Sequence, residues 1–115
     1  SLPTFSEQVG QKISRQDDLF SFTVEPFMLE QNGVLANGVL TEILTRIAQQ
    51  LMVNSGRSLI IDQLMIYFFQ AVQIDDLLHI QPRIIRQTRR TAIIDFEMYL
   101  EAMLVAKATI TVKIN

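Results

Sequence analysis

The sequence predicts an α+β domain in which one long helix packs against a curved antiparallel sheet of about five to six strands. Two observations carry this prediction. One segment alone has the three- and four-residue spacing of an amphipathic helix, and nearly everything after it has the alternating or β-branched pattern of strands. The chain has 115 residues, of which 49% are hydrophobic and 19% charged. That length and composition suit a single globular core.

The helix is expected from Gly38 to about Asn54. Asn37 is placed to cap it, because an asparagine side chain accepts hydrogen bonds from the first free amides of a helix. Gly56 stands where a left-handed residue commonly ends a helix. The apolar positions that define its buried face are Val39, Leu40, Ile43, Leu44, Ile47, Ala48, Leu51 and Met52.

Strand patterns surround the helix. Residues 19–30 are typical of a first strand that bends near Pro26, since proline is confined to strand edges and bends. Short turns join antiparallel neighbours, so the segments after the helix are expected to form a meander of four strands. These segments are residues 59–69, 77–88, 92–100 and 103–114, separated by turns at Asp75–Asp76, Thr88–Arg90 and Glu101–Ala102.

The run from Leu64 to Phe69 is apolar on both faces of its strand, although the chain offers only one helix as cover. A second copy of the chain is the expected cover, so we predict a homodimer, with a dimer of dimers as an alternative. Residues 1–18 are polar and weakly patterned and are expected to be an extension or linker before a domain at 19–115. Because the chain also begins without methionine, we expect it to be part of a longer protein.

Composition excludes several classes of function. Ten basic and twelve acidic residues give a net charge of -2, which does not favour nucleic acid as a partner. The absence of cysteine excludes disulfides and thiolate metal sites. No apolar run approaches the roughly 18 residues of a membrane helix, and no signal peptide pattern opens the chain. A cytoplasmic protein without membrane contact is the expectation.

Three segments resemble a known family: NGVLANGVL at the helix start, IYFFQAVQIDD along the next strand, and TRRTAIIDFEMYLEAMLVAKATITV near the end. Together they are similar to the hotdog-fold thioesterases of the 4-hydroxybenzoyl-CoA thioesterase type, over roughly residues 19–114. The narrower resemblance is to the hotdog domain at the C-terminal end of bacterial proteins that also carry DRTGG and CBS domains. It implies a dimer that holds a CoA thioester at the subunit interface. The helix start would approach the thioester carbonyl, and a basic turn would hold the CoA phosphates.

The resemblance also identifies a departure from the catalytic pattern. Family thioesterases carry His-Gly-Gly at the helix start and an acid about two turns later, whereas this chain has Ala36-Asn37-Gly38 and Thr45. Glu42 lies one turn before Thr45, so Glu42 and Asn37 are the remaining catalytic candidates. The related dehydratases share the Gly-Val-Leu helix start but need an upstream histidine and an acid just after Glu42, and this chain has neither. The pattern therefore favours binding of a thioester over its cleavage.

Each candidate binding group has a plainer interpretation. The amides of Gly38 and Val39 carry partial positive charge and suit a carbonyl oxygen, or they simply face water at a capped helix start. Arg89, Arg90 and Thr91 belong to an arginine-rich stretch that suits phosphate oxygens, or that protects a hairpin rim from aggregation. With Met65 and Tyr67, Phe69 would line an acyl pocket or belong to an ordinary core.

His79 is the only histidine, and no acid stands at triad or metal-ligand spacing from it, so we expect a bystander and no metal site. Three functions remain open. The first is a ligand-sensing module that binds an acyl-CoA, the second an active acyl-CoA thioesterase, and the third a dimerisation domain without a ligand. No cofactor is expected beyond a CoA thioester as ligand or substrate.

Overall fold

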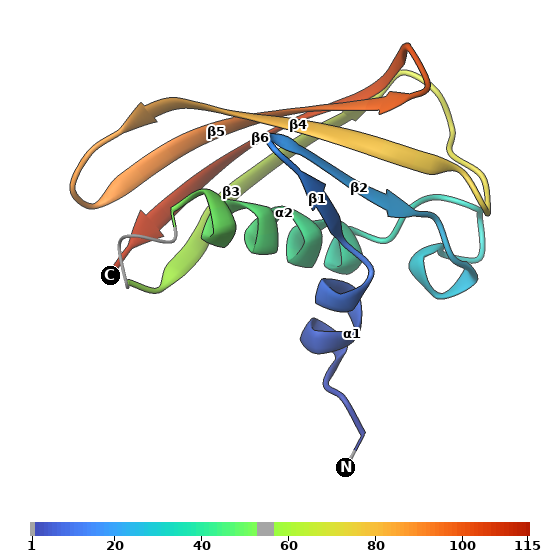
Figure 1. The fold of residues 1–115 in the computed structure, drawn as a ribbon, viewed down its shortest axis with the longest axis horizontal. Helices are drawn as coiled ribbons and strands as arrows, with labels where there is room; N and C mark the ends of the chain where they lie inside the picture. Colours follow the sequence, from blue (N-terminus) through green and yellow to red (C-terminus); the bar gives the residue numbers. More distant parts are fainter. Residues whose placement is uncertain (1, 53–56) are drawn as a thin grey trace.

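The computed structural model describes residues 2–52 and 57–115, and Figure 1 shows a curved sheet wrapped over one long helix. This arrangement confirms the predicted α+β architecture. The helical elements are α1 (Phe5–Gln11), η1 (Pro26–Met28, a 3-10 turn) and α2 (Asn37–Leu51). The strands are β1 (Ser14–Gln16), β2 (Leu19–Thr23), β3 (Leu59–Phe68), β4 (Leu77–Gln87), β5 (Thr91–Leu100) and β6 (Met103–Ile114). No helix among these residues is long and apolar enough to cross a membrane.

The six strands form one antiparallel sheet in the order β1-β2-β4-β5-β6-β3. The predicted four-stranded meander is therefore wrong, because only β4, β5 and β6 follow one another and β3 pairs with β6 instead of β4. The physical reason lies in the link between β3 and β4. The amide of Asp75 donates to the carbonyl of Val24, and the amide of Val24 donates to the carbonyl of Asp76, both at 2.8 Å. These bonds fasten the link to the end of β2, so β4 pairs with β2.

The core lies between α2 and the concave face of the sheet. The helix buries the predicted face, including Leu40, Leu44 and Ile47, which are fully inaccessible. The predicted alternation also holds in β5, where Ile94 and Phe96 are fully buried between neighbours that are not. Periodicity along the helix and along the strands thus places both partners of the core correctly.

The start of α2 differs from the prediction by one residue. Its N-cap is Ala36, whose carbonyl accepts from the amide of Leu40 at 3.0 Å, and no side chain caps the first turn. Asn37 is the first helical residue, so its predicted role as the cap is wrong. The amide of Ala36 donates to the carbonyl of Met28 at 2.8 Å, and this tertiary bond fixes where the helix begins. The predicted C-cap, Gly56, lies outside the described residues.

The N-terminal part of the chain packs against the rest. Helix α1 lies on the side of α2 that faces away from the sheet (Figure 1), and its Val9 is fully buried in the core. Strand β1 pairs with β2, so that Ser14 stands opposite Ser21. Residues 5–16, which the sequence pattern assigns to an extension, therefore contribute to both the core and the sheet. The first strand, expected over 19–30, ends at Thr23 before the 3-10 turn that starts at Pro26.

We expect Val9→Ala to lower the free energy of unfolding by about 2 kcal/mol, because it removes two buried methyl groups and leaves a cavity. Chemical denaturation monitored by circular dichroism measures this change. Leu2→Ala is the control, since Leu2 is 93% exposed. An unchanged midpoint for Val9→Ala would mean that α1 does not unfold together with the rest of the domain.

Candidate functional site

A cavity of ≈ 260 Å³ opens beside the start of α2, between the turn that precedes this helix and the end of β3. Leu35 and Val72 form its nearly inaccessible floor, and the half-exposed side chains of Val34 and Phe69 form its rim. The complete lining is Gly33, Val34, Leu35, Phe68, Phe69, Gln70, Ala71 and Val72. None of these residues carries a charge, so the described walls are apolar apart from Gln70 and the backbone.

The turn before α2 presents one wall of this cavity. Gly33 adopts a φ of 79°, a left-handed conformation that favours glycine, and its amide donates to the carbonyl of Glu30 at 2.9 Å. The amide of Glu30 in turn donates to the carbonyl of Val34 at 2.8 Å, and Leu29 bridges Leu35. This small hairpin holds Val34 and Leu35 opposite the end of β3.

The first amides of α2 lie next in the chain to that wall. Those of Asn37, Gly38 and Val39 precede the first intrahelical hydrogen bond, and no acidic residue or side-chain cap occupies the first turn. They therefore keep the partial positive charge of a helix start. A Cβ built on Gly38 would meet no atom within 4 Å, so space is open beside this turn. None of the predicted residues Asn37, Gly38 and Val39 lines the cavity, but they directly follow its wall in the chain, at the end of the molecule where Phe69 lies.

Two further predicted residues of α2, Glu42 and Thr45, make their side-chain hydrogen bonds away from the cavity. The Ser6 hydroxyl donates to Glu42 Oε1 at 2.5 Å, and Arg46 Nε donates to the same oxygen at 3.2 Å. Thr45 turns its hydroxyl back to the carbonyl of Thr41 at 2.6 Å. Neither Glu42 nor Thr45 lines the cavity. The structure therefore does not bring these two predicted residues to the site.

The contacts around Glu42 fasten α1 to α2. Arg46 Nη2 donates to the Ser6 hydroxyl at 2.5 Å, which closes a three-residue tie. A Cβ on Gly10 would lie 2.6 Å from Arg46 Nη1, so glycine leaves room for the guanidinium. Sequence patterns did not point to Ser6 and Gly10, because Ser6 and Glu42 are 36 positions apart and leave no local pattern to read.

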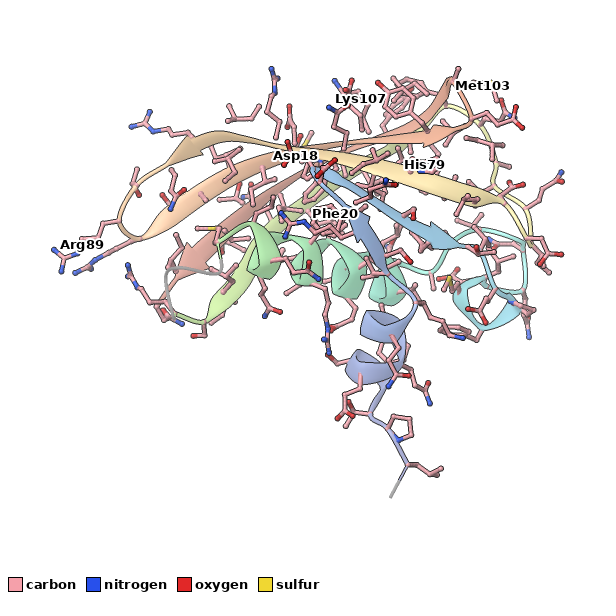
Figure 2. All side chains as sticks on the ribbon, viewed as in Figure 1. Asp18, Phe20, His79, Arg89, Met103 and Lys107 are labelled. Atoms are coloured by element: carbon pink, nitrogen blue, oxygen red, sulfur yellow. The ribbon has the colours of Figure 1, made fainter. Side chains whose placement is uncertain are left out.

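The residues predicted to bind the CoA phosphates lie at the other end of the sheet. Arg89 and Arg90 are exposed at the tip of the β4–β5 hairpin, and Figure 2 shows Arg89 projecting away from the body of the molecule. Thr91 and Thr88 share a hydroxyl hydrogen bond of 2.7 Å that stabilises this turn. Within one chain, the arginines are separated from the start of α2 by the length of β4.

Arg57 supports that hairpin and was not singled out from the sequence. Its Nη1 donates to the carbonyl of Arg89 at 2.8 Å, and its Nε and Nη2 donate to the carbonyls of Asn115 and Ile114 at 3.0 and 3.1 Å. It therefore fixes the backbone of the turn against the end of β6. It also adds a third positive charge beside Arg89 and Arg90.

The convex face of the sheet carries the other singled-out residues. Met65 and Tyr67 are 75% and 68% exposed there, and of the predicted acyl stripe only Phe69, whose ring lies 5.3 Å from that of Tyr67, lines the cavity. His79 stands between Ser21 and Tyr99 on neighbouring strands, and its Nδ1 is buried without a hydrogen-bond partner among the described residues. Partial burial and the nearby Glu97 carboxylate, which accepts from the Tyr99 hydroxyl at 3.2 Å, raise the pKa of Tyr99.

Comparisons with known proteins agree with this architecture. A hypothetical thioesterase from Streptococcus pneumoniae TIGR4, crystallised with coenzyme A, superposes with a TM-score of 0.73 at 24% identity and covers 90% of this chain and 84% of its own. The protein smu.793 from Streptococcus mutans UA159, bound to acetyl CoA, gives a TM-score of 0.74 at 19% identity, with 90% and 87% covered. At these identities the similarity establishes the fold, and it confirms the hotdog arrangement of a long helix inside a curved sheet.

Sequence comparison extends this similarity to a family. The uncharacterized protein YtoI of Bacillus subtilis (strain 168) is 29% identical over 97 residues, which are 84% of this chain and 22% of YtoI. The chain thus spans about a fifth of that relative. The family model described as Thioesterase superfamily matches residues 32–107, a segment that contains the cavity, the start of α2 and most of the sheet. This chain therefore belongs to the thioesterase superfamily.

Proposed function

We propose that this domain binds an acyl-CoA thioester at the cavity beside the start of α2, in a site that a second copy of the chain completes, and that it senses the ligand without cleaving it. The observation that carries the proposal is an uncharged cavity whose wall residue Leu35 stands just before the uncapped first turn of α2 in the chain, in a member of the thioesterase superfamily. The S. pneumoniae and S. mutans structures, which hold coenzyme A and acetyl CoA, support a CoA-type ligand.

The homodimer is supported by the edge of the sheet. Strand β3 is ten residues long, lies at the edge of the sheet next to β6 among the described strands, and carries a single charged residue, Asp62. A long apolar edge strand presents a row of unpaired backbone groups to any matching strand. Antiparallel pairing of β3 with β3 of a second copy satisfies these groups and follows the two-fold symmetry of most dimers.

Such pairing also completes the site. The start of β3 lies at the hairpin end of the sheet, because Leu59 is opposite Ile114 and the amide of Ile114 donates to the carbonyl of Arg90 at 2.8 Å. The end of β3, at Phe68, lines the cavity. A two-fold axis at the middle of β3 therefore brings Arg89 and Arg90 of the partner subunit toward this chain's cavity. One subunit supplies the acyl pocket and helix amides, and the other supplies the arginines for the phosphates.

The chemistry of the cleft favours binding. Helix-start amides stabilise the partial negative charge of a thioester oxygen, and hydrolysis further requires a group that takes a proton from water. The described cavity lining carries no carboxylate or imidazole, and the Glu42 carboxylate is already bonded to Ser6 and Arg46. A thioester that is bound without an adjacent base is not hydrolysed and stays in the site, as a sensor requires.

A catalytic role is the second candidate, and membership of the thioesterase superfamily favours it. In that case a water molecule near Asn37, or the Glu42 carboxylate released from its tie, would attack the thioester carbon, the carbon–sulfur bond would break, and CoA would leave as its thiol with a proton from water. The developing oxyanion would lie at the amides of Gly38 and Val39. Free-thiol release therefore distinguishes a sensor from an enzyme.

The sensing role further supposes attached regulatory domains. The match to only 22% of YtoI supports a domain that works within a longer protein. The similarity to hotdog domains that accompany DRTGG and CBS domains leads us to propose the same setting here. A ligand-free dimerisation domain is the remaining outcome, and the ligand-binding measurement below tests it directly.

We expect CoA thioesters to stabilise the protein without being hydrolysed. A ligand at a hundred times its Kd adds about 2.7 kcal/mol to the free energy of unfolding, which is readily seen as a rise in Tm. The same samples are assayed for free thiol. Stabilisation without thiol release supports the sensor, and thiol release above the buffer rate supports the enzyme. No stabilisation by any CoA compound supports a dimerisation domain without a ligand.

Light scattering on the same protein distinguishes a monomer, a dimer and a dimer of dimers.

Arg89→Ala is expected to weaken CoA binding about tenfold, because a charge-assisted contact to phosphate contributes about 1.5 kcal/mol or more. The dimer should persist, since Arg89 is exposed at the hairpin tip, away from the middle of β3. Titration calorimetry at two salt concentrations measures the affinity. Arg83→Ala is the matched control, because Arg83 is an exposed arginine within β4, away from the tip of the hairpin. Equal effects of the two substitutions would remove the phosphate role of Arg89.

We expect Glu42→Ala to lower the free energy of unfolding by about 1–2 kcal/mol through loss of its bonds to Ser6 and Arg46. Glu30→Ala, which alters an exposed glutamate, should change it little. A double-mutant cycle with Ser6→Ala should be non-additive, because both changes break the same tie. If Glu42→Ala instead abolished thiol release by an active protein, Glu42 would be catalytic and the sensor proposal would be wrong.

A further inference from the structure

Resting on the proposed function, we infer that the cavity selects thioesters whose acyl group is uncharged, apolar and no longer than on the order of eight carbons. The inference concerns the acyl end of the ligand alone. It follows from the chemistry of the cavity walls and from the cavity volume.

The walls exclude a charged acyl group. All eight lining residues are uncharged, and the floor consists of Leu35 and Val72, which are 2% and 5% exposed. An acyl group that ends in a carboxylate would lose its hydration there and meet no cation among the described lining residues, which is unfavourable. The pantetheine arm of CoA separates the phosphates from the acyl group. Arginines bound to the phosphates therefore do not compensate the buried carboxylate.

The volume limits the length. A cavity of ≈ 260 Å³ lies below the roughly 300–1,000 Å³ of pockets that take drug-sized ligands. Divided by the about 30 Å³ of a water molecule in the liquid, it has room for roughly nine such volumes. A methylene group takes up nearly the same space, so a medium-length chain or one aromatic ring fills the cavity. Longer chains must extend beyond these walls.

Two rim positions allow the selection to be changed without disturbing the core. Val34 is 49% exposed, and Ala71 is exposed in the link that follows β3. Both line the cavity. A long side chain at either position can therefore reach the cavity while its backbone stays in place.

The first experiment measures Kd for CoA, acetyl-, hexanoyl-, octanoyl-, dodecanoyl- and succinyl-CoA by titration calorimetry on the dimer. From acetyl to hexanoyl, Kd should fall threefold to fourfold per methylene, which is on the order of a hundredfold in total. Dodecanoyl-CoA should bind no tighter than octanoyl-CoA. Succinyl-CoA should bind at least tenfold more weakly than hexanoyl-CoA.

The second experiment uses substitutions to change which acyl group binds more tightly. Val34→Lys places a cation at the rim, so it should strengthen succinyl-CoA binding at least tenfold and weaken hexanoyl-CoA binding, whereas Val34→Met should do neither. Ala71→Phe should weaken octanoyl-CoA at least tenfold more than it weakens acetyl-CoA. Ala102→Phe makes the same change at an exposed turn outside the cavity and should not discriminate between them. Tm measurements confirm that each variant is folded.

The outcomes separate this inference from the proposed function. If CoA compounds bind but the acyl group does not affect Kd, or if succinyl-CoA binds as tightly as hexanoyl-CoA, the acyl selection is wrong and the CoA site stands. If no CoA compound binds to the folded protein, the proposed function itself fails. If Val34→Lys and Val34→Met behave alike, the acyl group lies elsewhere and the inference is overturned.

Discussion

The burial of one face of α2 against the concave side of the sheet positions every other feature of this molecule. Leu40, Leu44 and Ile47 are fully inaccessible, as are Ile94 and Phe96 on the facing strand. Truncating one such side chain to alanine typically costs about 2–5 kcal/mol. Because this packing fixes the helix axis, it also fixes the first turn of α2 beside the end of β3, where the cavity opens.

Patterns that repeat along the chain could be predicted from the sequence. The buried face of α2 and the alternation in β5 follow from helix and strand periodicity, and the structure confirms both. Features set by contacts distant in sequence were not predictable in this way. The bond from the Ala36 amide to Met28 moves the helix start by one residue, and the bonds between Val24 and the Asp75–Asp76 turn place β4 beside β2.

The candidate site shows the same division. The alternation along β3 led to Phe69 as a residue of an acyl pocket, and Phe69 does line the cavity. The position of Arg89 relative to Asn37 could not be predicted, since it depends on which end of the sheet each turn occupies. The i,i+4 spacing of Glu42 and Arg46 is that of a helix-surface ion pair and can be read from the sequence, whereas the contact of Ser6 with Glu42 left no trace in it.

The tie of Ser6, Glu42 and Arg46 has a mechanical consequence. It joins α1 to the same helix whose first turn borders the cavity, and Val9 anchors α1 in the core. These contacts hold α1 against the face of α2 that is turned away from the sheet. The helix that begins beside the cavity is thus the same helix that carries the N-terminal segment of the described chain, so one element supports both.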